Sequence, residues 1–200
     1  MVLYKIRLRQ RNKMDKQTLR EEIKTRKTRL NTKDEHKYTK DIVSHISVSR
    51  MFLEAKVIMG YLAMEDEVNI DPVLQLALSS AKIVCVPKIL EGEGNMEAAQ
   101  LVALKQLPKD SYGIRTVQEP YEIIQPEDID LVLVPGLSFS PDGGRLGRGK
   151  GFYDRFLPKC TKAKSMGVGY EMQVLRDIPL NGHDCKVNYL VTERALRVCK

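Results

Sequence analysis

The runs Asp130-Leu-Val-Leu-Val-Pro135 and Asp142-Gly-Gly-Arg-Leu-Gly-Arg-Gly-Lys-Gly-Phe-Tyr-Asp154 decide the fold of this chain. The first is a short apolar run, which is consistent with a buried strand. The second is a glycine-rich loop that leads into a helix beginning at Phe152. Parallel α/β sheets bind ligands beyond the carboxyl ends of their strands, and this loop follows its strand in that direction. The two runs therefore predict a parallel sheet that carries a binding loop at its carboxyl edge.

The composition of the loop indicates a polyphosphate site. Glycine lets the backbone approach a ligand closely, and consecutive backbone N–H groups can then converge on an anion. Cationic side chains add charge, and the N-terminus of the following helix also attracts anions. The loop supplies five glycines and three cations: Gly143, Gly144, Gly147, Gly149, Gly151, Arg145, Arg148 and Lys150. The alternative is an exposed glycine-rich turn whose charges are solvated.

Known phosphate motifs fit this loop only in part. The stretch from Gly144 to Lys150 has P-loop spacing, but Gly151 stands where a Ser or Thr would carry the magnesium. A metal would therefore need another ligand, and Asp154, one helical turn further on, is the candidate. The alternative for Asp154 is an ordinary first-turn acid that the helix dipole favours.

Helical and strand patterns alternate on either side of the loop. Residues 16–30 and 34–48 are predicted to be helices, and Asp71-Pro72 predicts a third helix with Asp71 as its cap. Residues 96–104 fit either a helix or an edge strand. Further short apolar strands are predicted at residues 56–62, 82–87, 165–170 and 189–192. This alternation predicts a mostly parallel sheet with helices on both faces.

The bulk composition is that of a globular protein of one domain. The 200 residues are 42% hydrophobic and 30% charged, and no apolar run approaches the length of a membrane span. Residues 1–13 hold five Lys or Arg and no acid, so they account for five of the seven net positive charges. We therefore predict a basic extension at residues 1–13, unstructured or non-native, and a single domain at 14–200, with Met14 as a second candidate start.

Charge and cysteine usage limit the possible partners and compartments. The body of the chain is close to neutral, so we expect no nucleic-acid partner and no membrane association. The four cysteines form no C-x-x-C pair, which argues against a zinc site and favours a reduced, intracellular protein. We expect a cytoplasmic location, or a mitochondrial or plastid one if residues 1–13 belong to a transit peptide.

The chain resembles the 5-formyltetrahydrofolate cyclo-ligase family, also called 5,10-methenyltetrahydrofolate synthetases. The resemblance rests on Val134-Pro-Gly-Leu-Ser-Phe139 and on Arg145 to Arg155, and it covers residues 14 to about 194. Weaker matches follow in the same order: Lys16-Gln-Thr-Leu-Arg20, Leu62 to Val68, Tyr112-Gly-Ile114 with Glu119-Pro120, Gly167 to Tyr170 with Gln173, and Val191-Thr-Glu193.

The resemblance implies a three-layer α/β/α fold with a mostly parallel sheet, of the CoA-transferase-like kind. It also implies an ATP-dependent enzyme that uses Mg²⁺ and closes 5-formyltetrahydrofolate to 5,10-methenyltetrahydrofolate, releasing ADP and phosphate. The γ-phosphoryl group would activate the formyl oxygen, and N10 would then close the ring. We expect the enzyme to be a monomer.

The resemblance also assigns site residues. Those expected near ATP are Lys16, Gln17, Thr18, Leu19, Arg20, Arg145, Leu146, Gly147, Arg148, Gly149, Lys150, Gly151, Phe152 and Tyr153. Of these, Arg145 and Lys150 are expected to stabilise the transferred phosphoryl group. Those expected at the folate are Arg20, Leu62, Glu67, Arg148, Gly149, Lys150, Gly151, Phe152 and Tyr153. Asp154 is expected to hold Mg²⁺, with Asn188 as an uncharged second ligand. Lys24 and Lys27 are expected to face solvent.

Three positions depart from the family pattern. Asn188 stands where many members have an aspartate, Ser140 replaces an acid, and Phe152 replaces a tyrosine. Without the resemblance, Glu67 would be an ordinary turn carboxylate. The change at Asn188 leaves a second hypothesis open, which is a catalytically weak homologue that binds folate and nucleotide.

Overall fold

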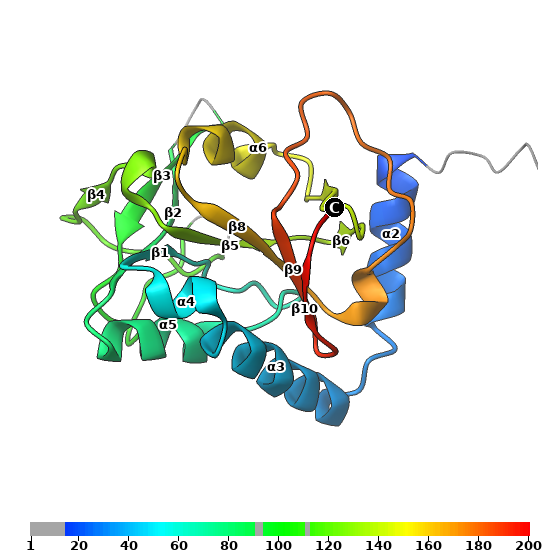
Figure 1. Ribbon diagram of the computed structural model, residues 1–200, viewed down its shortest axis with the longest axis horizontal. Helices are drawn as coiled ribbons and strands as arrows, with labels where there is room; N and C mark the ends of the chain where they lie inside the picture. The colour runs from blue at the N-terminus through cyan, green and yellow to red at the C-terminus, as the bar shows by residue number, and fades with distance from the viewer. Residues whose placement is uncertain (1–14, 91–93, 111–112) are drawn as a thin grey trace, which may run out of the picture.

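The computed structural model describes residues 15–90, 94–110 and 113–200. Its centre is an eight-stranded sheet of order β10-β9-β8-β5-β1-β2-β3-β4 (Figure 1). The five strands from β9 to β2 run parallel, whereas β10, β3 and β4 pair antiparallel at the two edges. The predicted mostly parallel sheet is therefore confirmed. The predicted extension at residues 1–13 lies outside the described residues.

The strands and helices have the following bounds. The strands of the main sheet are β1 (Val57–Met59), β2 (Ile83–Ile89), β3 (Met96–Gln100), β4 (Ile123–Ile124), β5 (Leu131–Pro135), β8 (Lys164–Val168), β9 (Tyr189–Val191) and β10 (Leu196–Val198). The α-helices are α2 (Lys16–Lys27), α3 (Thr32–Ser47), α4 (Arg50–Glu54), α5 (Asp71–Ser79) and α6 (Phe152–Phe156), and short 3₁₀ turns are η1 (Pro126–Asp128), η2 (Leu157–Lys159) and η3 (Glu171–Gln173). A separate hairpin consists of β6 (Ser138–Phe139) and β7 (Arg145–Leu146).

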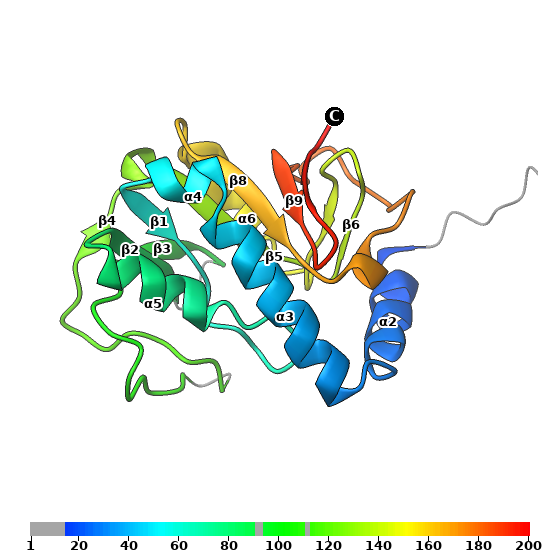
Figure 2. The ribbon, with the colours of Figure 1, turned by 60° about the horizontal axis from the view of Figure 1, so that its bottom comes forward.

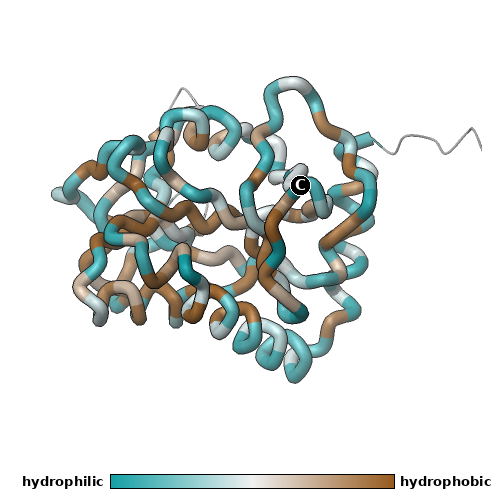
Figure 3. Tube along the Cα trace, in the orientation of Figure 1, coloured by the Kyte–Doolittle hydropathy of each residue, from teal (hydrophilic) through white to brown (hydrophobic). Residues whose placement is uncertain are grey.

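The period-two geometry of β5 divides the core into two layers. Leu131 and Leu133 join the cluster that contains residues of α3, α4 and α5, whereas Val132 and Val134 join the cluster that contains Phe156 of α6. Helices therefore cover both faces of the sheet, with α3 and α5 on one side and α6 on the other (Figures 1 and 2). The hydrophobic strands run through the middle of the molecule (Figure 3).

Local structure settles one open alternative and departs from the sequence predictions elsewhere, since α4, β4 and β10 were not predicted. Residues 96–104, left open between helix and strand, begin with strand β3, which pairs with β2. Asp71 lies inside the first turn of α5 rather than capping it, and its carboxylate pairs with Arg115 at 2.7 and 2.9 Å. The hairpin β6–β7 was not predicted, because each of its strands has only two residues.

The side chain of Phe139 packs the hairpin against the sheet. Phe139 is fully buried, and it lies against glycines at the carboxyl ends of β5 and β8. A Cβ added at Gly136 or at Gly167 would stand 2.6 Å from the ring, and one at Gly169 would stand 3.1 Å from it. Real Cβ atoms rarely or never come this close to another atom, so glycine at these three positions leaves the space that the Phe139 ring occupies.

Substituting Gly167 should test the packing of Phe139 against the glycines. We expect Gly167→Ala to lower the free energy of unfolding by about 1–3 kcal/mol, because the added methyl group must displace the Phe139 ring. Urea unfolding followed by circular dichroism would measure the loss. Gly182→Ala is the matched control, because nothing lies within 4 Å of its added Cβ. Equal free energies of unfolding for both variants would contradict this packing role of Gly167.

Candidate active site at the glycine loop

The glycine loop lies beyond the carboxyl end of β5, where the sequence places it. Gly143 has φ +87°, and a Cβ there would stand 2.3 Å from the carbonyl oxygen of Val187. Gly149 has φ +100°, and a Cβ there would stand 3.3 Å from the guanidinium of Arg20. Both positions therefore favour glycine because φ is positive, and at Gly143 the close passage of the chain leaves no room for a Cβ.

Helix α2 brings a cation from the start of the chain onto this loop. Arg20 donates from Nε to the carbonyl oxygen of Gly147 at 2.9 Å. The helix packs there through Leu19 and Ile23, which join Leu137 and Leu146 in a small separate core. The structure therefore places Leu19 and Leu146 in packing positions, while Gln17 and Thr18 lie exposed at the helix start. Figure 2 shows α2 beside the hairpin end of the molecule.

Arg145 lies beneath the loop rather than on its open face. Only 5% of its side chain is exposed, and its Nη2 donates to Asp154 at 3.0 Å. Its guanidinium carbon also stands 5.4 Å from the centre of the Tyr153 ring. In contrast, Lys150 is exposed, and its ammonium has no partner within the described ranges. Of the two residues predicted to stabilise the phosphoryl group, Lys150 is the one that is free to meet a ligand.

Two buried polar atoms at the site lack a hydrogen bond within the described part of the chain. They are Nε of Arg145 and the hydroxyl of Tyr153. Burial, together with the charge of Glu67, raises the pKa of Tyr153 well above its usual range, so the phenol stays protonated. A buried donor without a partner costs free energy, and a polar ligand can offset that cost.

An acidic turn faces the loop from the other side of the site. Arg148 pairs with Asp66 and donates from Nε to Glu67 at 3.2 Å. Glu67 also accepts from the backbone N–H of Met64 at 3.0 Å, so its own turn holds the carboxylate in place. Leu62 is buried at the start of this segment. The structure thus brings Glu67 and Arg148 together, as the sequence-based assignment to a common ligand requires.

The residues predicted to bind a metal occupy different environments. Asp154 uses Oδ1 to accept from Arg145 and from the backbone N–H of Cys185 at 3.1 Å, while its Oδ2 has no partner among the described residues. Asn188 uses Oδ1 to accept from the N–H and the hydroxyl of Ser165, at 2.9 and 3.0 Å. A carbonyl oxygen has two lone pairs, so Asn188 has none left. Asp154 therefore keeps one carboxylate oxygen available to a cation, whereas the side-chain oxygen of Asn188 is used by Ser165.

The prediction that Lys27 faces solvent is wrong, whereas Lys24 is exposed as expected. The side chain of Lys27 is 13% exposed, its Nζ stands 5.1 Å from the centre of the Tyr170 ring, and Glu35 lies 3.8 Å away. Lys24 and Lys27 lie on the same helix, but Glu35 of α3 and the ring of Tyr170 lie against Lys27. Burial lowers the pKa of Lys27, while Glu35 acts against this effect.

Replacing Lys27 with an apolar residue should not weaken the fold. We expect Lys27→Met to leave the free energy of unfolding unchanged or about 1 kcal/mol higher near pH 7, because burying an unbonded ammonium is costly. Lys27 has a lowered pKa when folded, so this cost falls as the pH rises toward 10.5. Any advantage of the variant should therefore shrink with rising pH. Denaturant titrations across this range, with Lys24→Met as control, would show whether it does.

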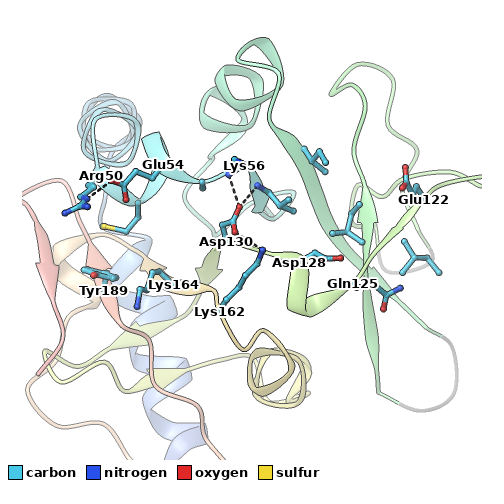
Figure 4. A pocket seen from close by; sticks show the side chains of 16 residues that line it. Arg50, Glu54, Lys56, Glu122, Gln125, Asp128, Asp130, Lys162, Lys164 and Tyr189 are labelled. Carbon is cyan, nitrogen blue, oxygen red and sulfur yellow. Dashed lines mark hydrogen bonds and ion pairs between the residues drawn. The ribbon is translucent and has the colours of Figure 1, made fainter.

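A groove lies at the edge of the sheet opposite the glycine loop. This groove of about 1070 Å³ runs past the amino ends of β1, β2, β5 and β8 (Figure 4). At its centre, Asp130 accepts from the backbone N–H groups of Lys56 and Val57 and pairs with Lys162. None of the residues predicted for the site lines this groove.

No helix in the described ranges is long and apolar enough to cross a membrane.

A mostly parallel sheet, covered by helices on both faces and carrying a cation-lined glycine loop at its carboxyl edge, defines an α/β protein. The model of the 5-formyltetrahydrofolate cyclo-ligase family matches residues 12–193, so the chain belongs to that family. The enzyme of this name from Mus musculus is 29% identical over 89% of this chain and 93% of its own length.

Solved structures agree with the assignment. The 5,10-methenyltetrahydrofolate synthetase of Aquifex aeolicus superposes with a TM-score of 0.81 at 29% identity, covering 92% of this chain and 93% of that one. The synthetase of Mycoplasma pneumoniae shares the fold, with a TM-score of 0.73 at 23% identity and coverage of 90% and 99%. The resemblance and the fold class expected from sequence are therefore confirmed.

Proposed function

We propose that this protein is a ligase that converts 5-formyltetrahydrofolate to 5,10-methenyltetrahydrofolate at the expense of ATP. Membership of the family supports the reaction. The single structural observation that carries it is the glycine loop, where the exposed Lys150 has no partner among the described residues and Arg20 lies across the loop. Positioning and charge neutralisation are what phosphoryl transfer requires of a protein.

The reaction has two steps. The formyl oxygen attacks the γ-phosphorus of ATP, and ADP leaves. N10 of the folate then attacks the activated carbon and loses its proton, and the carbon–oxygen bond breaks as phosphate departs. A formamide oxygen is a poor leaving group, and phosphorylation makes it a good one. The protein's task is to hold the triphosphate and the formyl group in line and to balance the negative charge.

The loop and its neighbours divide this task. Lys150 is proposed to neutralise charge on the γ-phosphoryl group, and Arg20 to bridge phosphate and loop. Arg145 acts from below by holding Asp154, and its buried Nε is available to a ligand atom that reaches it. Backbone N–H groups of residues 146–151 complete the cradle. Lys16, Gln17 and Thr18 are assigned to ATP at the N-terminal end of α2.

The folate is assigned to the opposite side of the loop. Glu67, held by Met64 and Arg148, would accept hydrogen bonds from pterin N–H groups. The buried hydroxyl of Tyr153, which has no hydrogen-bond partner among residues 15–90, 94–110 and 113–200, would bond to the substrate. Leu62 and Phe152 would supply apolar contact.

Magnesium is proposed to bind at Asp154 through Oδ2, which has no partner in the described part of the chain, together with phosphate oxygens of ATP, because Mg²⁺ proteins often use one carboxylate and substrate phosphates. Bound there, the ion would reduce the negative charge of the triphosphate. We further propose a monomer formed by residues 14–200, without a nucleic-acid partner. Its location is cytoplasmic, or organellar if residues 1–13 belong to a transit peptide.

Turnover can be followed by the absorbance of methenyltetrahydrofolate with and without ATP. We expect Lys150→Ala to lower kcat by about 10²–10³, because its charge acts on the transferred group. Lys24→Ala, which removes an exposed cation from α2, is the matched control and should keep full activity. A loss of less than about fivefold in Lys150→Ala would reject its role. No ATP-dependent turnover in the wild type would reject the proposed function.

The metal assignment can be tested without turnover. Mn²⁺ binding in the presence of ATP, measured by water proton relaxation, should weaken about tenfold or more in Asp154→Asn. In Asn188→Asp it should change less than about threefold, because Ser165 holds this side chain in place through its Oδ1. A large gain in metal affinity and in turnover for Asn188→Asp would instead support the catalytically weak homologue.

A further inference from the structure

We infer that Asp184 is a positioning residue for ATP, because it holds the ammonium of Lys16 beside the glycine loop. This inference rests on the proposed function and adds to it a residue that neither the loop nor the family assignment singled out.

The contact between the two side chains is bidentate and partly buried. Lys16 Nζ donates to Asp184 Oδ1 at 2.8 Å and to Oδ2 at 2.6 Å. The exposed fractions of the side chains are 22% for Lys16 and 16% for Asp184. An ammonium has three N–H donors, and Asp184 uses two of them. One donor remains without a partner among the described residues, so Lys16 can meet a phosphate while Asp184 still holds it.

Asp184 is itself fixed from its own segment. Its Oδ2 accepts from the backbone N–H of Asn181 at 2.5 Å. Burial acts to raise its pKa, but the hydrogen bonds from Asn181 and Lys16 and the charges of Lys16 and Arg145 outweigh that effect, so the pKa is lowered. Asp184 is therefore an anion at neutral pH, and it offers Lys16 a fixed point of attachment.

The next residue links the same segment to the loop. The backbone N–H of Cys185 donates to Asp154 Oδ1, the oxygen that also accepts from Arg145. Two adjacent residues, Asp184 and Cys185, thus hold one cation from α2 and one carboxylate from α6. Lys16 lies one helical turn before Arg20, so it projects from the same helix face as the Arg20 side chain that contacts Gly147.

A surface lysine without such a contact would lose much rotamer freedom on meeting a phosphate. Asp184 removes most of that freedom in advance, which lowers the entropic cost of binding. Asp184 also places a negative charge near the phosphates, and this charge weakens binding by repulsion. If positioning of Lys16 dominates, removal of Asp184 raises the Kd for ATP. If repulsion dominates, removal lowers it, so a binding experiment can distinguish the two effects.

The experiment is calorimetric binding of a non-hydrolysable ATP analogue and, separately, of 5-formyltetrahydrofolate. We expect Asp184→Ala to raise the Kd of the ATP analogue about tenfold and to leave the Kd of the folate unchanged. Asp184→Glu should restore much of the affinity, since a carboxylate remains to hold Lys16. In a Lys16→Ala background, Asp184→Ala should have little further effect, because both residues act through one contact.

Asp177→Asn is the matched control, because it removes an exposed carboxylate from the same segment. Tighter analogue binding in Asp184→Ala would overturn the inference, and so would an equal loss of affinity for both ligands or additive effects with Lys16→Ala. If the alanine variant fails to fold, Asp184→Asn and Asp184→Glu provide the same comparison. Failure of the wild type to bind the analogue would instead reject the proposed function itself.

Discussion

The binding edge of this protein depends on the contact between the Phe139 ring and three glycines. Strands β5 and β8 pair side by side and end together, and their glycines leave space for the ring. The ring fixes β6, β6 fixes β7, and the loop leaves β7 toward α6. Gln173 adds hydrogen bonds from its amide to the carbonyls of Gly136 and Leu137. The glycine loop is therefore attached to two central, mostly buried strands of the sheet.

Charges around the loop alternate in sign, and this pattern determines which of them can meet a ligand. Arg145 is paired with Asp154, Arg148 with Asp66 and Glu67, and Lys16 with Asp184. These pairs hold backbone and side chains in place at little net charge. Within the described ranges, Lys150 keeps its whole ammonium unpaired. An incoming polyanion therefore meets a surface that is already ordered, and little reorganisation is needed when it binds.

Sequence reasoning located the sheet and the loop because both signals are local. The apolar run of β5 and the glycine spacing need no knowledge of distant residues. The role of Lys27 could not be predicted, because its burial depends on α3 folding over it, and helical spacing alone cannot show that. The pairing of Asp184 with Lys16 joins residues 168 positions apart. The glycines under Phe139 were visible in the sequence, but the ring that requires them lies on another element.

Helix α2 is attached to the rest of the molecule by few contacts. Of its twelve residues, only Leu19 and Ile23 are buried, and they belong to a core separate from the two that cover the sheet. Such a segment opens at a lower free energy than the strands, so its amide hydrogens should exchange with solvent before those of β5 and β8. Because α2 carries Lys16 and Arg20, transient detachment of this one helix would uncover the glycine loop at Gly147 while the sheet stays intact.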